Sequence, residues 1–304
     1  MKKSDGTESF HSIKHIEAGI LNVGYVDEGP VNGPVVMLLH GWPYDIHSFT
    51  EVAPLLVARG YRVIVPYLRG FGSTFFIDDK TIRSGQQSAM AEDIVDLMDA
   101  LHIGNAILAG FDWGGRAAQI VAALWPKRCK ALVSVSGYTI INTSANLNPL
   151  APKTEETWWY QYYFATERGK RGYSTNLIDF NKLIWKNASP RWEFDEGTYN
   201  RTAEAFKNPD HVGIVIHNYR WRLSLVPGDE RYRDHEKRLD KNEFITVPTI
   251  TIASDFDREL ADGSSYADKF TGKYSHRVLS GIGHNVPQEA PEAFAHAIFE
   301  VDSY

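Results

Sequence analysis

Several features are scarce in this 304-residue chain, and each scarcity excludes a class of protein. Cys129 is the only cysteine, so no intrachain disulfide is possible and a disulfide-stapled scaffold is excluded. No apolar run approaches the roughly 18 residues of a membrane span, and residues 1–8 lack the apolar stretch of a signal peptide. We therefore expect a cytoplasmic protein without a membrane association.

Positive charge is also scarce, because 32 Lys and Arg stand against 38 Asp and Glu, for a formal net charge of −6. The basic residues are spread along the chain, so the electrostatic footprint of a nucleic-acid-binding protein is missing. The sequence contains neither the metal-binding H-E-x-x-H spacing nor a phosphate-binding glycine-rich loop. It therefore predicts a globular protein that needs no metal or organic cofactor and binds no nucleic acid.

What the chain does have is an alternation of short apolar runs and amphipathic stretches. Buried strands are expected at 34–39, 61–66, 105–109, 131–136, 244–253 and 275–279, and helices at 48–59, 89–101 and 291–299. This alternation predicts an α/β protein with a mostly parallel, doubly wound sheet. Between residues 139 and 242 the sequence becomes helical, polar and rich in aromatic residues. We expect residues 1–138 and 243–304 to form one α/β core, with 139–242 inserted as a helical cap.

The most informative residue is Asp112, at the centre of the segment Gly110-Phe111-Asp112-Trp113-Gly114. The segment lies between an expected strand and helix and has the G-x-S-x-G spacing of a nucleophile elbow, with Asp in the central position. A carboxylate is ionised at neutral pH and attacks saturated carbon, whereas an ester carbonyl would give only an anhydride. Asp112 therefore favours epoxides or alkyl halides as reactants. The alternative is that Asp112 only caps the helix.

A second motif, His40-Gly41-Trp42-Pro43, follows the expected buried strand 34–39 directly. A backbone N–H at this position can enter an oxyanion hole. We expect the amides of Trp42 and Trp113 to form that hole. The alternative is an ordinary turn built on glycine and proline.

Late in the chain, His284 stands in a glycine-flanked loop between an expected strand and the last helix. Such a histidine suits a general base that acts on a covalent ester, although it could also be an ordinary surface histidine. Asp255 and Asp257 both follow the expected strand 244–253, and either could orient the histidine or cap a helix.

Together, these motifs resemble those of the α/β-hydrolases that include epoxide hydrolases and haloalkane dehalogenases, and the resemblance extends from about residue 12 to residue 300. It implies the α/β-hydrolase fold with an inserted cap, Asp112 as the nucleophile and His284 as the base. In the family, the acid stands nine positions after the proline of a Val-Pro-Thr strand, here Pro248, which selects Asp257 (257 − 248 = 9) over Asp255.

The cap resembles that of epoxide hydrolases, which bind and protonate the epoxide oxygen with two tyrosines. The segments 159–164 and 217–222 are similar to the two tyrosine segments of the family, which implies that Tyr160 and Tyr219 act, with Tyr163 in reserve. The alternative is that these tyrosines only pack the cap. The residues expected to bind substrate are His40, Pro43, Trp159 and Tyr163.

The predicted function is hydrolysis of a small apolar or aromatic epoxide by water to a vicinal diol, through an ester on Asp112. A haloalkane dehalogenase is the alternative, because Trp113 could donate to a halide, although Trp42 stands where many dehalogenases have Asn. Fluoroacetate dehalogenases usually carry Arg directly after the nucleophile, and Arg116 matches only their second arginine, for which we expect a structural role. Remoter alternatives are a non-catalytic ligand-binding protein and a serine esterase using Ser136. The sequence leaves a homodimer open.

Overall fold

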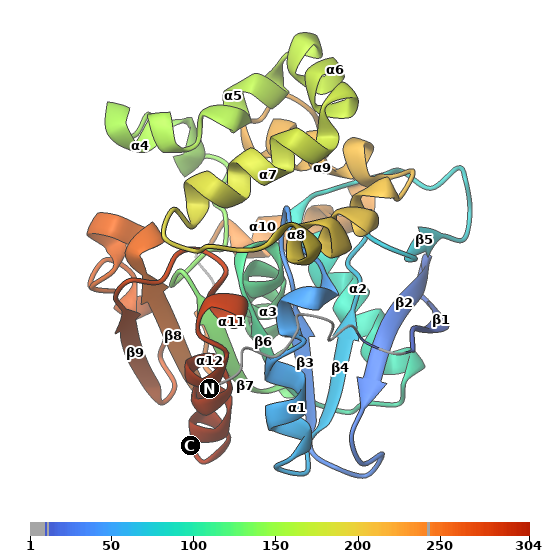
Figure 1. The fold of residues 1–304 in the computed structure, drawn as a ribbon, viewed down its shortest axis with the longest axis vertical. Coiled ribbons are helices and arrows are strands. Elements are labelled where there is room, and N and C mark those ends of the chain that lie inside the picture. The colour runs from blue at the N-terminus through green and yellow to red at the C-terminus, as the bar shows by residue number, and fades with distance from the viewer. Residues whose placement is uncertain (1–9, 11, 242–243) are drawn as a thin grey trace.

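A computed structural model describes residue 10 and residues 12–241 and 244–304. The described residues form one nine-stranded sheet with helices on both faces (Figure 1). Its spatial order is β1-β2-β4-β3-β6-β7-β8-β9, and β5 pairs with β2. The strands are β1 Lys14–Ala18, β2 Leu21–Glu28, β3 Val35–Leu39, β4 Arg62–Pro66, β5 Phe75–Phe76, β6 Ala106–Gly110, β7 Cys129–Val135, β8 Thr249–Ser254 and β9 Tyr274–Leu279.

The strands from β4 to β9 along this order are parallel, whereas β1, β2 and β5 are joined by antiparallel pairing. The central strand β6 is buried at every residue because helices cover both faces of the sheet. The predicted doubly wound α/β sheet is therefore confirmed. The expected strand at 244–253 is shorter, because Pro248 has no amide for the ladder and residues 244–248 form only a single bridge, from Ile245 to Phe270.

Two pairs of helices sandwich the sheet. Helices α2 (Gln87–Ala100) and α3 (Asp112–Leu124) pack together on one face, and α1 (Val52–Val57) and α12 (Pro291–Asp302) pack together on the other (Figure 1). The short helix α11 (Val286–Glu289) leads into α12. Helix α3 therefore starts at the carboxyl end of the central strand β6, where the loops after the parallel strands converge.

Seven α-helices lie between β7 and β8 in the described residues. They are α4 Pro152–Thr157, α5 Trp159–Ala165, α6 Glu167–Thr175, α7 Leu177–Ala188, α8 Glu196–Ala203, α9 His211–Arg222 and α10 Arg233–Leu239. Figure 1 shows α4 to α7 and α9 above the sheet, whereas α10 lies behind it, against α3. There the His235 ring packs on Trp125 at 4.9 Å and its Nε2 atom lies 3.0 Å from Glu92. We propose that the functional cap ends before α10. Its expected boundary, residues 242 and 243, falls outside the described residues.

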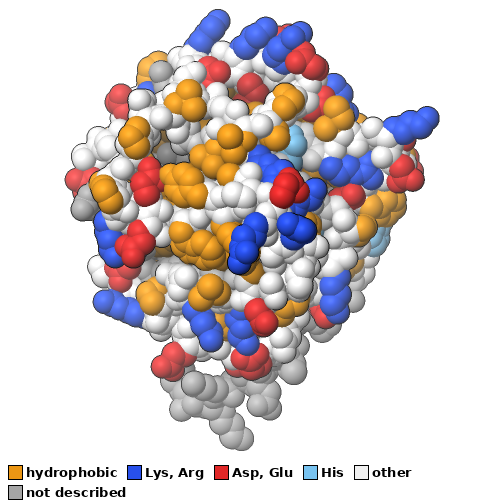
Figure 2. Space-filling view, turned by 90° about the horizontal axis from the view of Figure 1, so that it is seen from above, with side chains coloured by type: hydrophobic (Ala, Val, Ile, Leu, Met, Phe, Trp, Pro, Cys, Tyr) orange, Lys and Arg blue, Asp and Glu red, His pale blue; other side chains and the backbone are white. Residues whose placement is uncertain are grey.

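The outer face of the cap shows hydrophobic side chains interspersed with charged ones (Figure 2). The large exposed hydrophobic residues of this region include Leu147, Leu150, Tyr162, Ile178 and Leu183. In the described part of the chain, no helix is both long enough and apolar enough to span a bilayer.

Candidate active site

Asp112 lies at the sharp turn from β6 into α3, with a left-handed φ of 51°. The neighbouring glycines make this turn possible. A Cβ atom on Gly110 would lie 2.7 Å from the carbonyl carbon of Gly114, and one on Gly114 would lie 2.1 Å from the carbonyl oxygen of Leu39. A Cβ on Gly41 would lie 2.4 Å from the Asp112 side chain, so the loop after β3 also passes close to the carboxylate. The turn is a nucleophile elbow in its geometry.

Two backbone amides converge on this carboxylate. The Trp42 N–H donates to Oδ1 of Asp112 at 2.7 Å, and the Trp113 N–H also forms a hydrogen bond with the carboxylate. The structure thus brings together the two amides expected from the sequence. Donors placed in this way would stabilise negative charge that develops on an Asp112 ester during its hydrolysis.

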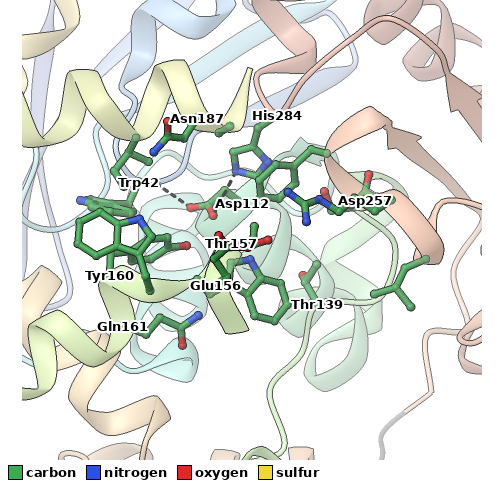
Figure 3. Close-up of a pocket in the computed structure, with 18 of the residues that line it drawn as sticks. Trp42, Asp112, Thr139, Glu156, Thr157, Tyr160, Gln161, Asn187, Asp257 and His284 are labelled. Atoms are coloured by element: carbon green, nitrogen blue, oxygen red, sulfur yellow. Dashed lines mark hydrogen bonds and ion pairs between the residues drawn. The ribbon is translucent and has the colours of Figure 1, made fainter. Parts of the chain in front are cut away.

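The electrostatic environment of Asp112 keeps it ionised. Burial alone would raise its pKa, but hydrogen bonding and attraction from His284, the charge of Arg116 and the Trp113 amide together lower the pKa below its ordinary value. The His284 Nε2 atom lies 3.5 Å from Oδ2 of Asp112. Figure 3 shows Trp42 and His284 reaching the carboxylate from two sides. An anionic nucleophile is therefore present without a base to activate it.

The cap holds His284 in place. The His284 amide donates to the carbonyl oxygen of Ala188 at 3.2 Å and to Oγ of Ser189 at 2.9 Å, both at the end of α7. The imidazole packs on Phe256 with ring centroids 4.2 Å apart. Its Nδ1 atom is buried and has no hydrogen-bond partner among the residues that the structure describes. That atom is therefore positioned to receive an orienting carboxylate.

Of the two candidate acids, Asp257 faces this histidine. Burial raises the pKa of Asp257, while hydrogen bonds from Ser254 and the charge of His284 oppose the rise. The Ser254 amide donates to Oδ2 of Asp257 at 2.8 Å, and no hydrogen bond joins Asp257 to Nδ1 of His284. Asp257 thus lies in the electrostatic field of the histidine without a direct contact.

Asp255 points elsewhere. Its carboxylate forms an ion pair with Arg191 at 3.0 Å and accepts a hydrogen bond from the Gly281 amide at 3.0 Å. The side chain is 44% exposed. These contacts favour a role in tying the surface loops together over a role in orienting His284.

Above Asp112 lies a cavity of about 640 Å³, walled by both the core and the cap (Figure 3). Residues that contribute to its wall include Trp42, Asp112, Arg116, Thr139, Glu156, Trp158, Trp159, Tyr160, Asn187, Arg222, Asp257 and His284. A cavity of this size accommodates a small organic substrate.

The two expected tyrosines lie together in the cap. Tyr160 of α5 lines the cavity, and Tyr219 of α9 lies behind it, 1% exposed, with ring centroids 5.3 Å apart. Both rings pack on Trp42, at 5.1 Å and 5.2 Å. Burial raises the pKa of Tyr160 to about 12 and raises that of Tyr219 well above its ordinary value. Both phenols therefore stay protonated and able to donate at neutral pH.

Of the four residues expected to bind substrate, the structure brings only Trp159 to the cavity wall. His40 is fully buried beneath it, where Nε2 accepts from the Leu68 amide and burial lowers the pKa to about 4. Pro43 follows a cis peptide bond and its carbonyl oxygen accepts from Nε1 of Trp185 at 2.7 Å. Tyr163 stacks on Phe180 within the cap, at 5.9 Å. These three residues hold neighbouring loops and helices rather than line the cavity.

Sequence reasoning missed a further residue, Glu289, at the end of α11. Its carboxylate accepts hydrogen bonds from Oγ of Ser189 at 2.6 Å, the Gly283 amide at 2.7 Å and the Asn285 amide at 3.1 Å. It therefore joins the loop that carries His284 to the cap. The only sequence signal for this role is the position of Glu289 shortly after that loop. The sequence contains no signal for the role of Ser189.

Comparisons with known proteins agree with this architecture. A family model described as the alpha/beta hydrolase fold matches residues 34–174. A Klebsiella pneumoniae protein, provisionally named an epoxide hydrolase, has a crystal structure that is 55% identical, covers 99% of this chain and 100% of that chain, and has a TM-score of 0.95. A laboratory-evolved potato epoxide hydrolase, 19% identical with a TM-score of 0.78 over 96% of this chain and 99% of that one, shares the fold.

Among curated proteins, epoxide hydrolase B of Mycobacterium tuberculosis is 31% identical over 45% of this chain and 41% of its own length. The matched region thus spans about two fifths of that relative. Human epoxide hydrolase 4 is 29% identical over 95% of this chain and 78% of its own length. The fold, the elbow geometry and these similarities together show that the chain belongs to the α/β-hydrolase superfamily and has epoxide hydrolases among its relatives.

Proposed function

We propose that the protein is an epoxide hydrolase that opens an epoxide to a vicinal diol through a covalent ester on Asp112. The observation that carries the proposal is one cavity with an ionised carboxylate on its floor and a phenol donor, Tyr160, on its wall. The carboxylate supplies a nucleophile for a ring carbon, and the phenol supplies a donor for the ring oxygen. The relatives named above support the same reaction.

In the first step, an oxygen of Asp112 attacks a ring carbon and forms a carbon–oxygen bond. The ring carbon–oxygen bond breaks, and its electron pair stays on the oxygen, which Tyr160 binds and protonates with Tyr219 packed beside it. Because an alkoxide is a poor leaving group in water, an O–H donor at this oxygen lowers the barrier. The product of the step is an alkyl ester on Asp112.

In the second step, His284 takes a proton from water, and that water attacks the carbonyl carbon of the Asp112 ester. The amides of Trp42 and Trp113 stabilise the oxyanion, a contribution typically worth about 3 kcal/mol per donor. Collapse of this intermediate passes the proton of the added hydroxyl to the departing alkoxide, which releases the diol and restores the carboxylate. The proton held by His284 then returns through solvent to the Tyr160 phenolate, so both residues regain their starting states. Asp257 would orient His284 and stabilise the imidazolium once it moves into contact with Nδ1.

Replacing the base tests the intermediate. His284→Gln should still form the ester but fail to hydrolyse it, so intact-mass measurement after adding styrene oxide should show one substrate mass added. His296→Gln, at an exposed histidine on α12, should show no adduct and turn over at the wild-type rate. Asp112→Asn should show neither adduct nor turnover. An adduct that persists in Asp112→Asn, or its absence from His284→Gln while the wild type is active, would contradict the proposal.

One observation favours a haloalkane dehalogenase instead. Nε1 of Trp113 is buried and has no hydrogen-bond partner in the described part of the chain, as expected of a halide donor. The neighbouring indole donors are occupied, because Nε1 of Trp42 donates to the Tyr173 hydroxyl and Nε1 of Trp185 to the Pro43 carbonyl. The double variant Tyr160→Phe, Tyr219→Phe separates the two functions. Epoxide opening should fall at least 100-fold, since phenol donors act on the alkoxide, whereas halide release from 1-bromobutane would barely change.

A further inference from the structure

Three arginines on the cavity wall are not used in the steps above, Arg116, Arg222 and Arg258, and the first two come from helices of the core and the cap. Arg116 follows Asp112 by four residues on α3, about 6 Å along the helix axis, so the two side chains share a face. Arg116 is 7% exposed and lines the cavity. Arg222, the last residue of α9, lines the same cavity from the cap. Core and cap therefore each place one guanidinium on the wall of the cavity that holds the nucleophile.

The hydrogen bonding of Arg116 is incomplete. Its Nε atom donates to the carbonyl oxygen of Thr139 at 2.8 Å, which fixes one edge of the guanidinium. Throughout the described ranges, its two terminal nitrogens donate to no protein atom. Buried polar groups are normally hydrogen-bonded, so four N–H groups of this side chain remain available to a molecule in the cavity.

Arg222 adds a second cation at the same place. Its guanidinium carbon lies 5.6 Å from the centre of the Tyr219 ring, and its buried Nε atom has no hydrogen-bond partner among the described residues. Burial and the positive charge of Arg222 lower the pKa of Arg116 to about 10. The two arginines thus repel each other across the cavity.

The described residues provide no direct counter-ion, since none places a carboxylate oxygen within 4.0 Å of either guanidinium. Asp112 attracts Arg116, but its oxygens already contact the Trp42 and Trp113 amides and His284. Glu156, on the same wall, is paired with Lys153 at 2.5 Å. A buried Arg116 beside a partly buried Arg222, neither with a carboxylate partner among the described residues, is unfavourable unless an anion joins them.

We infer that the substrate carries a carboxylate next to its epoxide ring and that Arg116 and Arg222 bind this group, an inference that rests on the proposed epoxide hydrolase function. A carboxylate accepts paired hydrogen bonds from a guanidinium. The two cations also offset the repulsion between an anionic substrate and Asp112. Trp158 and Trp159 on the cavity wall would accommodate the apolar remainder. The substrate is then an epoxy acid rather than the purely apolar epoxide that the sequence suggested.

A matched pair of substrates tests this inference. trans-3-Phenyloxirane-2-carboxylate and trans-2-methyl-3-phenyloxirane share a skeleton, and a methyl group replaces the carboxylate in the second. The wild type should open the acid with a kcat/KM at least ten times that of the neutral compound. Arg116→Gln and Arg222→Gln should each lower kcat/KM for the acid by about 30-fold or more, mainly through KM, because each removes a charged hydrogen-bond donor. Arg222→Gln should change the value for the neutral epoxide less than threefold. Arg116→Gln should lower that value by a clearly smaller factor than the value for the acid, although the charge of Arg116 also helps to keep Asp112 ionised.

The matched control is Lys182→Gln, which removes a cap cation that pairs with Glu196 outside the cavity and should leave both substrates unaffected. If the wild type opens the neutral epoxide but prefers it to the acid, or if the arginine variants lose both activities equally, the carboxylate site is wrong and the epoxide hydrolase proposal stands. If the wild type opens neither compound, both fail.

A binding measurement covers the case in which Arg116→Gln does not fold, as judged by circular dichroism. trans-Cinnamate keeps the carboxylate but has no epoxide. It should inhibit the wild type at a concentration at least tenfold lower than trans-β-methylstyrene, its neutral counterpart, and Arg222→Gln should abolish that difference. Equal inhibition by the two compounds would overturn the inference.

Discussion

At the scale of the residue, the chemistry depends on the conformation of Asp112. A non-glycine residue at φ 51° costs of order 1–3 kcal/mol, and the surrounding glycines and the ends of β6 and α3 impose it. The result is a carboxylate that receives two backbone amides and lies 3.5 Å from His284. Replacing either flanking glycine would force a Cβ atom into neighbouring backbone, so the elbow and its oxyanion site depend on each other.

The sequence predicted this part of the site because each of its residues is close in the chain to a motif. Asp112, Trp42 and Trp113 follow strand ends in short glycine-containing loops, which limit where they can lie. Arg222 and Ser189 could not be predicted, because they reach the site from cap helices whose packing no local pattern specifies. For the same reason Tyr163, expected near the substrate, faces Phe180 instead.

A prediction at this scale concerns the acid partner. Asp257→Asn should lower turnover about 1,000-fold, because an amide cannot stabilise the imidazolium that forms during ester hydrolysis. Asp255→Asn should stay within threefold of the wild type, because that residue only forms a partly exposed ion pair with Arg191. Single-turnover measurement should place the Asp257→Asn defect in ester hydrolysis. The reverse ranking of the two variants would reassign the acid to Asp255.

At the scale of the element, helix α2 carries a carboxylate, that of Asp96, whose ionisation destabilises the fold. Its acidic residues Asp93 and Asp99 pair with Arg69 and Arg128, at 2.6 Å each. Asp96 packs against the Gly19 backbone, where a Cβ atom would lie 1.8 Å from the Asp96 carboxylate. Among the described residues, Asp96 forms no ion pair. Burial and the neighbouring acidic residues raise the pKa of Asp96 to about 6.

This raised pKa makes stability depend on pH. Because the folded state binds the proton more tightly than the unfolded state, with its pKa near 3.8, stability is lost as pH rises from about 4 through about 6. Asp96→Asn should therefore unfold like the wild type near pH 4 and be more stable at pH 8. We expect Asp96→Asn to be about 1 kcal/mol more stable than the wild type at pH 8. This is well below the free energy that the whole pKa shift would give, since solvent screens a half-exposed group.

Urea denaturation at the two pH values measures this difference. Asp99→Asn is the matched control on the same helix, and it should lose at most about 0.5 kcal/mol of stability because the carboxylate of the ion pair that it breaks is 63% exposed. Equal stability of wild type and Asp96→Asn at pH 8 would show that the Asp96 carboxylate is not destabilising.

Element positions in the core followed from the sequence, because a strand buried on both faces has to be apolar throughout. The runs at 34–39 and 105–109 became β3 and β6 within one residue at each end. The strand predicted at 244–253 was too long at its start, because Pro248 divides the buried strand β8 from an extended segment of similar composition. Helix α10 lies within the range predicted as the cap, and that boundary stays a prediction. The packing of α10 on α3 depends on contacts such as His235 with Trp125, which are remote in sequence and which no local pattern specifies.

At the scale of the whole molecule, buried hydrogen bonds join the cap to the core. The Tyr173 hydroxyl of α6 accepts from Nε1 of Trp42 at 2.8 Å and donates to Nε2 of His211 at 2.9 Å. Nδ1 of His211 in turn donates to the Gly70 carbonyl at 2.9 Å. This network ties two cap helices to the loops after β3 and β4, and Trp42 also supplies an oxyanion donor. Cap position and site geometry are therefore coupled.

Removing one hydroxyl group tests that coupling. Tyr173→Phe leaves two buried partners unsatisfied and should lower the free energy of unfolding by about 1–3 kcal/mol, with a raised KM because the Trp42 ring and loop loosen. The control is Tyr162→Phe, whose hydroxyl binds Glu155 on the surface, and it should change stability by less than about 0.5 kcal/mol. Thermal melts and steady-state kinetics measure both effects. If Tyr173→Phe and Tyr162→Phe had the same stability and the same KM, the hydrogen-bond network would not hold the cap.

The covalent role of Asp112 is tested most directly by a single turnover in H₂¹⁸O with enzyme in excess over an epoxide. Water attacks the carbonyl carbon of the ester in the proposed reaction, so ¹⁸O should appear in the peptide that contains Asp112, and the first diol released should carry none. An unlabelled Asp112 peptide together with a labelled diol would mean that water attacks the epoxide directly, and it would contradict the account.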